Sequence, residues 1–280
     1  MIKQRTIKDS VRIEGAGLQT GKKATLNLKS SPPNSGINFI RTDLANKPLL
    51  NVQSLCLDKP SALAALRRTT LGAGPLQIQT TEHFLAALSG LSIDNIIAEL
   101  DSEELPGLDG SAKEFLDAMK KTGIIEQDAP KKILKIDKPL WCEGEDSILA
   151  VFPNDDFKIS YTLSYKEPAL GTKFLSIVID ENTFAKEIAP ARTFCLKEEA
   201  QALLKTGLGK GANFENTLVM DRDGPVKNVL RFPDEPIRHK ILDLVGDLYL
   251  LGMQIKGHVV CVKSGHRLNM ELVKKLKAII

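Results

Sequence analysis

The sequence has few cysteines and no long apolar run. Its cysteines are far apart and form no CxxC pair, so we expect reduced thiols and no disulfide framework: Cys56, Cys142, Cys195 and Cys261. No segment approaches the roughly 18 unbroken apolar residues of a membrane-spanning helix. The opening stretch MIKQRTIKDSVRIEG lacks the apolar core of a signal peptide. These absences predict a cytoplasmic protein without an integral membrane segment.

The sequence also lacks an excess of charge of either sign. Its 38 Lys and Arg residues stand against 35 Asp and Glu residues, which gives a net charge of +3, and aromatic residues make up only 5%. No basic block is interleaved with aromatic residues, so a nucleic-acid partner is not expected. A hydrophobic share of 42% with 26% charged residues is typical of a globular protein with a substantial core. The mild positive charge is compatible with a small substrate that carries phosphate.

Both halves of the chain show strand patterns first and helix patterns later. Alternating apolar residues bounded by turn residues predict strands in the first half at 12–20, 24–30, 37–43 and 92–100, and in the second at 133–137, 147–153, 157–165, 174–180 and 255–265. Helical spacing predicts helices at 80–91, 111–123, 194–207, 235–252 and 268–280. The polar segment EQDAPKK, 126–132, is interpreted as a linker. We therefore expect an α+β protein with two domains of similar architecture, 1–126 and 127–280, each a β-sheet layered with helices.

The stretch IRHKILDLVGD places three polar groups four residues apart in an otherwise apolar helix. His239 and Asp243 lie on one helix face, and their imidazole nitrogen and carboxylate oxygen suit zinc. Asp247 lies one turn further, where it can hold another group in place more readily than it can join the ligands. A solvated polar stripe on an amphipathic helix would give the same spacing, and the pattern alone leaves both interpretations open.

Other histidines lie at element ends. Glu82 and His83 open a predicted helix, where one can bind a metal while the other faces a bound water; a first-turn acid beside a half-buried histidine is the alternative. His266 follows Gly265 in a turn between a strand and a helix, a place that often carries function, although a capping role is equally compatible. His258 lies within a strand pattern without an acidic neighbour, and no catalytic role is expected for it.

Taken together, these segments resemble the UDP-3-O-acyl-N-acetylglucosamine deacetylase family, the zinc amidases of lipid A synthesis in Gram-negative bacteria. The resemblance rests on GAGLQTGKKATL, RTTLGAGPLQIQTTEHFLAALSGLSIDN, PARTF, EPIRHKILDLVGDLYLLG and KSGHRLN, in this order over nearly the whole chain. It implies two α+β domains that face each other with the active site between them. The implied substrate is a UDP-sugar with a fatty acyl chain, and its N-acetyl amide is hydrolysed.

The resemblance also implies a role for each motif residue. The zinc ligands would be His83, His239 and Asp243. The implied catalytic residues are Glu82 as general base, His266 as general acid or as the cation that stabilises the developing charge, Thr193 as the hydroxyl beside the oxyanion and Asp247 as the carboxylate that orients His266. Lys240 would lie beside the substrate.

The substrate needs two further surfaces. Its diphosphate would be met by cations beside the motifs, namely Lys240, Lys263 and Arg192. Its acyl chain would be met by the apolar segment 169–194, which runs from ALGTKFLSIVID to Phe194, because each buried methylene contributes about 0.8 kcal/mol. We expect the protein to act as a monomer.

One motif departs from the family pattern. The family usually has GLHTG where this chain has GLQTG, and Gln19 cannot become a cation. Two alternatives remain open from the residues alone. One is a zinc hydrolase of another amide, which would need neither an acyl groove nor diphosphate cations. The other is a non-catalytic nucleotide-sugar binding module, which would hold no stoichiometric zinc. Iron also accepts histidine and aspartate ligands.

Overall fold

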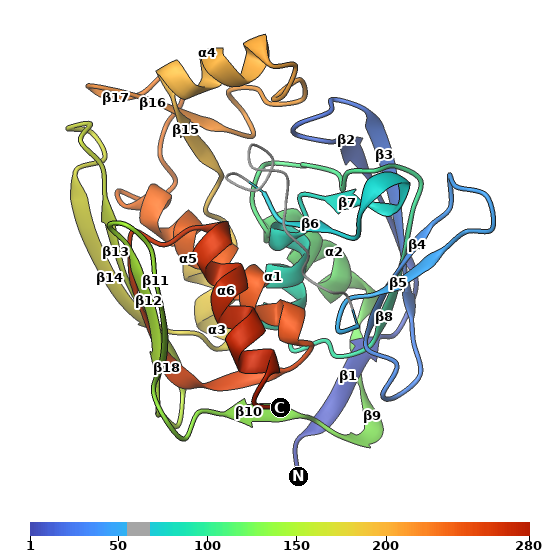
Figure 1. Ribbon diagram of the computed structural model, residues 1–280. Coiled ribbons are helices and arrows are strands. Elements are labelled where there is room, and N and C mark those ends of the chain that lie inside the picture. The colour runs from blue at the N-terminus through green and yellow to red at the C-terminus, as the bar shows by residue number, and fades with distance from the viewer. Residues whose placement is uncertain (55–67) are drawn as a thin grey trace.

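Two large sheets lie on opposite sides of the molecule in the computed structural model, which describes residues 1–54 and 68–280 (Figure 1). The first sheet has the order β2 (Val11–Ala16), β3 (Lys23–Ser30), β8 (Ile96–Leu100), β4 (Ile37–Arg41) and β5 (Leu49–Asn51). Its neighbouring strands are antiparallel except for β4 and β8. Strands β3 and β8 bury alternate residues, so along them one face of this sheet supplies core while the other is more exposed.

The second large sheet is built from the other half of the chain. Its order is β11 (Leu140–Glu143), β12 (Ile148–Phe152), β18 (Gln254–Val262), β13 (Phe157–Ser164) and β14 (Thr172–Val178), with β10 (Ile133–Lys135) paired to the start of β18. The central strand β18 buries every second residue over its whole length, as a half-buried strand does. Strands β13 and β18 run parallel.

Three small ladders complete the strand inventory. They pair β1 (Lys3–Ile7) with β9 (Ile124–Pro130), β6 (Thr70–Leu71) with β7 (Ile78–Gln79), and β15 (Phe194–Leu196) with β16 (Leu218–Asp221), which also pairs β17 (Gly224–Pro225). The linker predicted at 126–132 is therefore wrong, because most of it lies in β9. This segment is polar because it forms a two-stranded ladder with β1 and most of its side chains are partly or fully exposed.

Helices fill the space between the two large sheets (Figure 1). They are α1 (Glu82–Gly90), α2 (Lys113–Thr122), α5 (Glu235–Leu248) and α6 (His266–Lys277). The short α3 (Glu181–Thr183) continues into a π-helical turn, Phe184–Ile188, and α4 (Lys197–Lys205) lies with β15, β16 and β17 apart from the helical layer (Figure 1). Single 3₁₀ turns occupy Gly74–Leu76 and Tyr249–Leu251.

The contact between α1 and α5 joins the two halves of the molecule. All residues of α1 are buried, because one side meets the first sheet and α2 while the other meets α5. Phe84 of α1 packs edge-to-face on Phe39 and Phe115, with ring centroids 5.8 and 5.6 Å apart. On the opposite side, a Cβ at Gly246 of α5 would lie only 2.0 Å from the carbonyl oxygen of Glu82. Glycine at this position therefore lets the two helix backbones approach closely.

The mixed α+β class is confirmed, with several sheets layered with helices. The expected helices are present, but only α5 begins at the expected residue. α1 begins at Glu82, α2 at Lys113 and α6 at His266, each two residues from the expected start. α4 begins at Lys197 because Phe194–Leu196 pairs with β16. Within the described residues, no helix is long and apolar enough to cross a membrane. Cys142, Cys195 and Cys261 are buried and form no disulfide, whereas Cys56 lies outside the described residues.

Candidate active site

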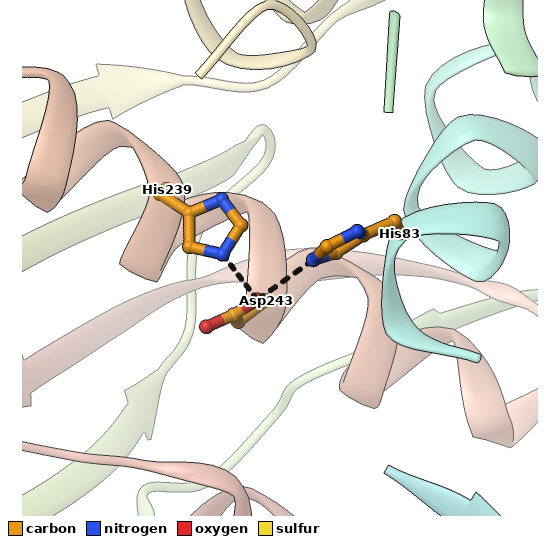
Figure 2. Close-up of side chains that lie close together, drawn as sticks. All are labelled: His83, His239 and Asp243. Carbon is orange, nitrogen blue, oxygen red and sulfur yellow. Dashed lines mark ion pairs between the residues drawn. The ribbon is translucent and has the colours of Figure 1, made fainter. Parts of the chain in front are cut away.

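A cluster of two histidines and one aspartate lies where α1 meets α5. His83 comes from the first turn of α1, and His239 and Asp243 come from successive turns of α5 (Figure 2). The Oδ1 atom of Asp243 is 3.2 Å from Nε2 of His239 and 3.8 Å from Nε2 of His83. The two imidazole rings lie nearly perpendicular, with centroids 5.0 Å apart. All three side chains are buried, and one ligand atom of each lies within 4.8 Å of the others. The structure thus brings together the three expected ligands.

The donor atoms of this cluster fit a metal ion. His239 donates from Nδ1 to the carbonyl oxygen of Ala191 at 3.0 Å, so its Nε2 keeps a free lone pair directed at the cluster. Within residues 1–54 and 68–280, Asp243 Oδ1 is buried and has no hydrogen-bond donor, which is costly for a carboxylate oxygen unless a cation meets it. Two imidazole nitrogens and one carboxylate oxygen match the three protein ligands of an open, catalytic zinc site.

Electrostatics keep the ligands in the form that binds a cation. Burial lowers the pKa of His83 to about 3, with His239 adding to the effect, so its imidazole is neutral at pH 7. Burial likewise lowers the pKa of His239. For Asp243, burial raises the pKa, but the charges of His239 and Lys240 outweigh it and hold the pKa below its usual range. Lys240 Nζ donates to Asp243 Oδ2 at 2.8 Å, which leaves Oδ1 for the metal side.

Glu82 lies beside the cluster as a separate carboxylate. It is only 2% exposed, and its Oε2 accepts a hydrogen bond from the backbone N–H of Thr69 at 3.0 Å. Burial raises the pKa of Glu82 to about 7, while the nearby imidazole of His266 counteracts part of the shift. A carboxylate with a pKa near 7 can take up and give up a proton at neutral pH, as a general base must.

His266 faces the same site from the start of α6. Its Nδ1 donates to Asp247 Oδ2 at 2.8 Å, and its Nε2 lies 3.9 Å from Asp243 Oδ2. Burial alone would lower the pKa of His266, but the charge and hydrogen bond of Asp247 raise it to about 9. The imidazole is therefore a cation at pH 7 and can donate a proton from Nε2. The row of polar residues on α5 is explained, because Asp247 faces His266 and not solvent.

One cavity of about 690 Å³ connects these groups. Its polar wall contains the cluster and other predicted site residues, namely Glu82, His83, Thr193, His239, Lys240, Asp243 and His266. Its apolar wall comes mainly from β15, α4 and the segments around β16, with Leu203, Ala212, Phe214 and Val219 among its members. Phe194 joins the two walls, since its ring lies 6.4 Å from the His239 ring and 5.9 Å from the Tyr165 ring.

Other residues that the sequence predicted to bind substrate do not line this cavity. Arg192 does not line it: its guanidinium is buried and donates to Glu235, Asn228 and Val229, so it holds the start of α5. Lys263 does not line it either and pairs with Asp146. Of the segment 169–194, expected at the acyl chain, only Thr193 and Phe194 line the cavity, because residues 172–178 form β14 of the second sheet. The other apolar lining residues come mainly from α4 and its flanks.

The departing motif GLQTG does reach the cavity. Leu18 and Gln19 line it, and the turn is held by the buried carboxylate of Glu104. Glu104 accepts from the backbone N–H groups of Gln19 and Thr20 at 2.9 and 2.8 Å, and from the Thr80 hydroxyl at 2.8 Å. Gln19 in turn accepts from the N–H of Gly209 through its side-chain oxygen at 3.2 Å. A neutral amide therefore connects this turn to the loop after α4.

Sequence reasoning missed three residues that support the site. Thr69 contacts both Glu82 and Asp247, Asn269 donates to Asp247 Oδ2 at 2.8 Å, and Glu104 holds the GLQTG turn. The spacing of Asn269 three residues after His266 could have revealed it, because such residues share a helix face. Nothing local marks Thr69 or Glu104, since their partners are far away in the chain.

A buried cluster of two imidazoles and a carboxylate, with a second carboxylate and a third histidine at the same cavity, is the arrangement of a metal-dependent hydrolase. A family model described as "LpxC: UDP-3-O-acyl N-acetylglycosamine deacetylase" matches residues 4–278. The chain belongs to this family.

Curated relatives agree over their full length. UDP-3-O-acyl-N-acetylglucosamine deacetylase of Chlamydia abortus is 42% identical over 279 residues, covering 99% of this chain and 98% of the relative. The enzyme of Chlamydia caviae is 43% identical with the same coverage. The enzyme of Thermodesulfovibrio yellowstonii is 41% identical over 273 residues, with 98% and 91% covered. The alternative of a non-catalytic binding module is thereby excluded.

Proposed function

We propose that the chain hydrolyses the N-acetyl amide of UDP-3-O-acyl-N-acetylglucosamine with Glu82 as general base and His266 as general acid. The chain is a zinc-dependent deacetylase of lipid A biosynthesis. The observation that carries the two proton roles is their geometry: Glu82 and His266 line the same cavity as the ligand cluster, yet each has its own set of partners outside that cluster.

His83, His239 and Asp243 would hold the zinc. When bound there, zinc lowers the pKa of water and polarises the amide carbonyl. Glu82 takes the proton from the attacking water, for which its raised pKa near 7 is suitable. The Thr193 hydroxyl faces the oxyanion of the tetrahedral state, where one such donor typically contributes about 3 kcal/mol. Thr193 is held in place because its N–H donates to Gly110 and its carbonyl accepts from Leu218, each at 2.8 Å.

The departing amine must be protonated, and His266 supplies that proton from Nε2. Asp247 accepts from Nδ1, which fixes the tautomer and keeps the imidazolium charged until transfer. Acetate and the free amine of the sugar are the products. At that point Glu82 carries one proton from water and His266 has lost its proton to the amine, so transfer of that proton from Glu82 to His266 through water restores both groups. The second proton of the water leaves with the acid product and is released to solvent as acetate forms. The base and the acid are thus separate groups with opposite proton states at neutral pH.

The cavity offers distinct surfaces for the two ends of the substrate. The fatty acyl chain lies against the apolar wall from α4, β15 and β16, together with Phe194. Burial of each methylene contributes about 0.8 kcal/mol, so roughly ten methylenes outweigh several polar contacts. Lys240 lines the polar side and provides a positive charge for the polar part of the substrate.

We also propose the larger organisation expected from the sequence. The division at 126 and 127 is supported by the two large sheets, each of which is formed within one half of the chain. The ligand cluster would then lie between the domains, since it joins α1 and α5. The described cysteines are buried and form no disulfide, which supports action in the bacterial cytoplasm, and a site built from one chain supports a monomeric enzyme.

Mass-spectrometric detection of the free amine from UDP-3-O-acyl-N-acetylglucosamine tests the reaction, with and without a chelator. Glu82→Gln and His266→Ala should keep zinc and lose turnover by about 100-fold or more. Lys263→Ala is the control variant, because the ion pair of Lys263 with Asp146 is exposed and lies outside the cavity. Arg192→Lys would not serve, because the buried ion pair of Arg192 with Glu235 supports the fold. Loss of zinc from Glu82→Gln would make Glu82 a ligand, and full turnover in either variant would remove its proposed role.

A further inference from the structure

Thr69 lies between the two halves of the proposed acid–base machinery. It precedes β6, is only 4% exposed and is separated from α5 by more than half of the chain. Its backbone N–H donates to Glu82 Oε2 at 3.0 Å, and its hydroxyl donates to Asp247 Oδ1. The hydroxyl oxygen also lies 3.2 Å from Nδ1 of His266. A single residue therefore contacts the base, the acid and the carboxylate that supports the acid.

From these contacts we infer that Thr69 is a positioning residue that aligns His266 through Asp247 and orients Glu82 through its N–H. The inference rests on the proposed roles of Glu82 and His266. It adds a residue that belongs neither to the ligand cluster nor to the cavity lining and acts only through its neighbours Glu82, Asp247 and His266.

The hydrogen bonds around Asp247 explain why the hydroxyl is needed. Asp247 is fully buried, and its Oδ2 accepts from both His266 and Asn269 at 2.8 Å. Among the described residues, the Thr69 hydroxyl is the donor assigned to Oδ1. A buried carboxylate oxygen without a donor is costly, so loss of this hydroxyl favours rotation of the carboxylate toward other partners. Such a rotation would turn the Nδ1 acceptor away from the His266 ring.

Thr69 is itself held by the element that leads into α1. Its carbonyl accepts from the N–H and from the hydroxyl of Thr81, both at 3.3 Å, and the next residue pairs with Gln79 in the β6–β7 ladder. Thr81 directly precedes Glu82. The short hairpin of β6 and β7 therefore holds the N–H of Thr69 at a fixed distance from the Glu82 carboxylate. The Thr69 hydroxyl, through its bond to Asp247, connects the same hairpin to α5.

The test compares Thr69→Val with Thr69→Ser. Valine keeps the shape and the N–H but removes the hydroxyl, whereas serine retains the hydroxyl. We expect Thr69→Val to lower kcat by about 10- to 100-fold with KM and zinc content little changed. Thr69→Ser should retain most of the kcat of the unchanged enzyme. Thr6→Val is the matched control, because Thr6 is a buried threonine whose hydroxyl accepts from Ser31 far from the site. In ¹⁵N spectra, the Nδ1–H resonance of His266 should shift in Thr69→Val and remain in Thr6→Val.

A double-mutant cycle separates positioning from general stability. If Thr69 acts through Asp247 and His266, adding Thr69→Val to His266→Ala should lower kcat little further, because the acid is already gone. If Thr69 acted on general stability instead, the fold-losses in kcat of the two single variants would multiply in the double variant. Multiplicative losses, or full kcat in Thr69→Val, would overturn the inference and leave the roles of Glu82 and His266 standing. Full kcat in His266→Ala would instead overturn the proposed acid. Should Thr69→Val unfold, the cycle can be run with Thr69→Ala and Thr69→Ser at matched thermal stability.

Discussion

The closest approach between α1 and α5 gives the sharpest test of how the fold makes the site. A Cβ at Gly246 would lie 2.0 Å from the carbonyl oxygen of Glu82 and 2.8 Å from its carbon. These are backbone atoms and cannot rotate away. The helices must therefore separate by roughly 1 Å or more before Gly246→Ala reaches an ordinary carbon contact distance of about 3.5 Å.

This separation acts directly on the ligand cluster, because His83 belongs to α1 while His239 and Asp243 belong to α5. Metal–ligand distances tolerate only about 0.2 Å, and a displacement of about 1 Å at a catalytic site can cost about 100-fold in rate. Overpacking should also lower the free energy of unfolding by about 1–3 kcal/mol. We thus expect Gly246→Ala to weaken zinc retention and to lower kcat/KM by about 100-fold.

The assay measures zinc per chain after dialysis against a graded chelator, kcat/KM, and unfolding by urea on the same samples. Gly265→Ala is the control, since a Cβ there meets no atom within 4 Å and the backbone is extended. Gly246→Ala should lose more zinc than its lower free energy of unfolding alone accounts for. Normal zinc retention and normal kcat/KM in a folded Gly246→Ala enzyme would refute the argument that the glycine sets the ligand geometry.

Substitution of any one proposed zinc ligand by alanine, at His83, His239 or Asp243, should weaken zinc binding and nearly abolish turnover. Metal analysis and the turnover assay on the same samples check this. Activity should fall below about pH 7, where Glu82 (pKa about 7) gains a proton, and above about pH 9, where His266 (pKa about 9) loses one; Glu82→Gln should flatten the first limb of the pH–rate profile and His266→Ala the second. A substrate without the 3-O-acyl chain should lose far more kcat/KM than one hydrogen bond accounts for, and equal rates for both substrates would leave the apolar wall without a role.

Some sequence predictions rest on local geometry alone. The four-residue spacing of His239, Asp243 and Asp247 predicts a common face on an α-helix, and the structure places all three on α5, two of them in the ligand cluster and the third against His266. The apolar spacing of α1 and α5 and the Gly or Pro near their ends likewise reflect local preferences. The linker at 126–132 was wrong for the opposite reason: polar composition does not distinguish a loop from a strand in an exposed ladder, and β9 forms only because β1 is beside it.

The residues around the site divide in the same way. Which side chains share a helix face could be predicted from residue spacing, and the resemblance to the family motifs implied the roles proposed for His83, Glu82 and His266. Three features could not be predicted because they depend on how distant segments pack: Glu235 accepts from the Arg192 guanidinium, α4 supplies part of the apolar wall, and Thr69 bonds to Asp247. Helix periodicity is a property of neighbouring residues. A buried hydrogen bond across 178 positions exists only after α1 and α5 have packed, and its partners carry no local mark of each other.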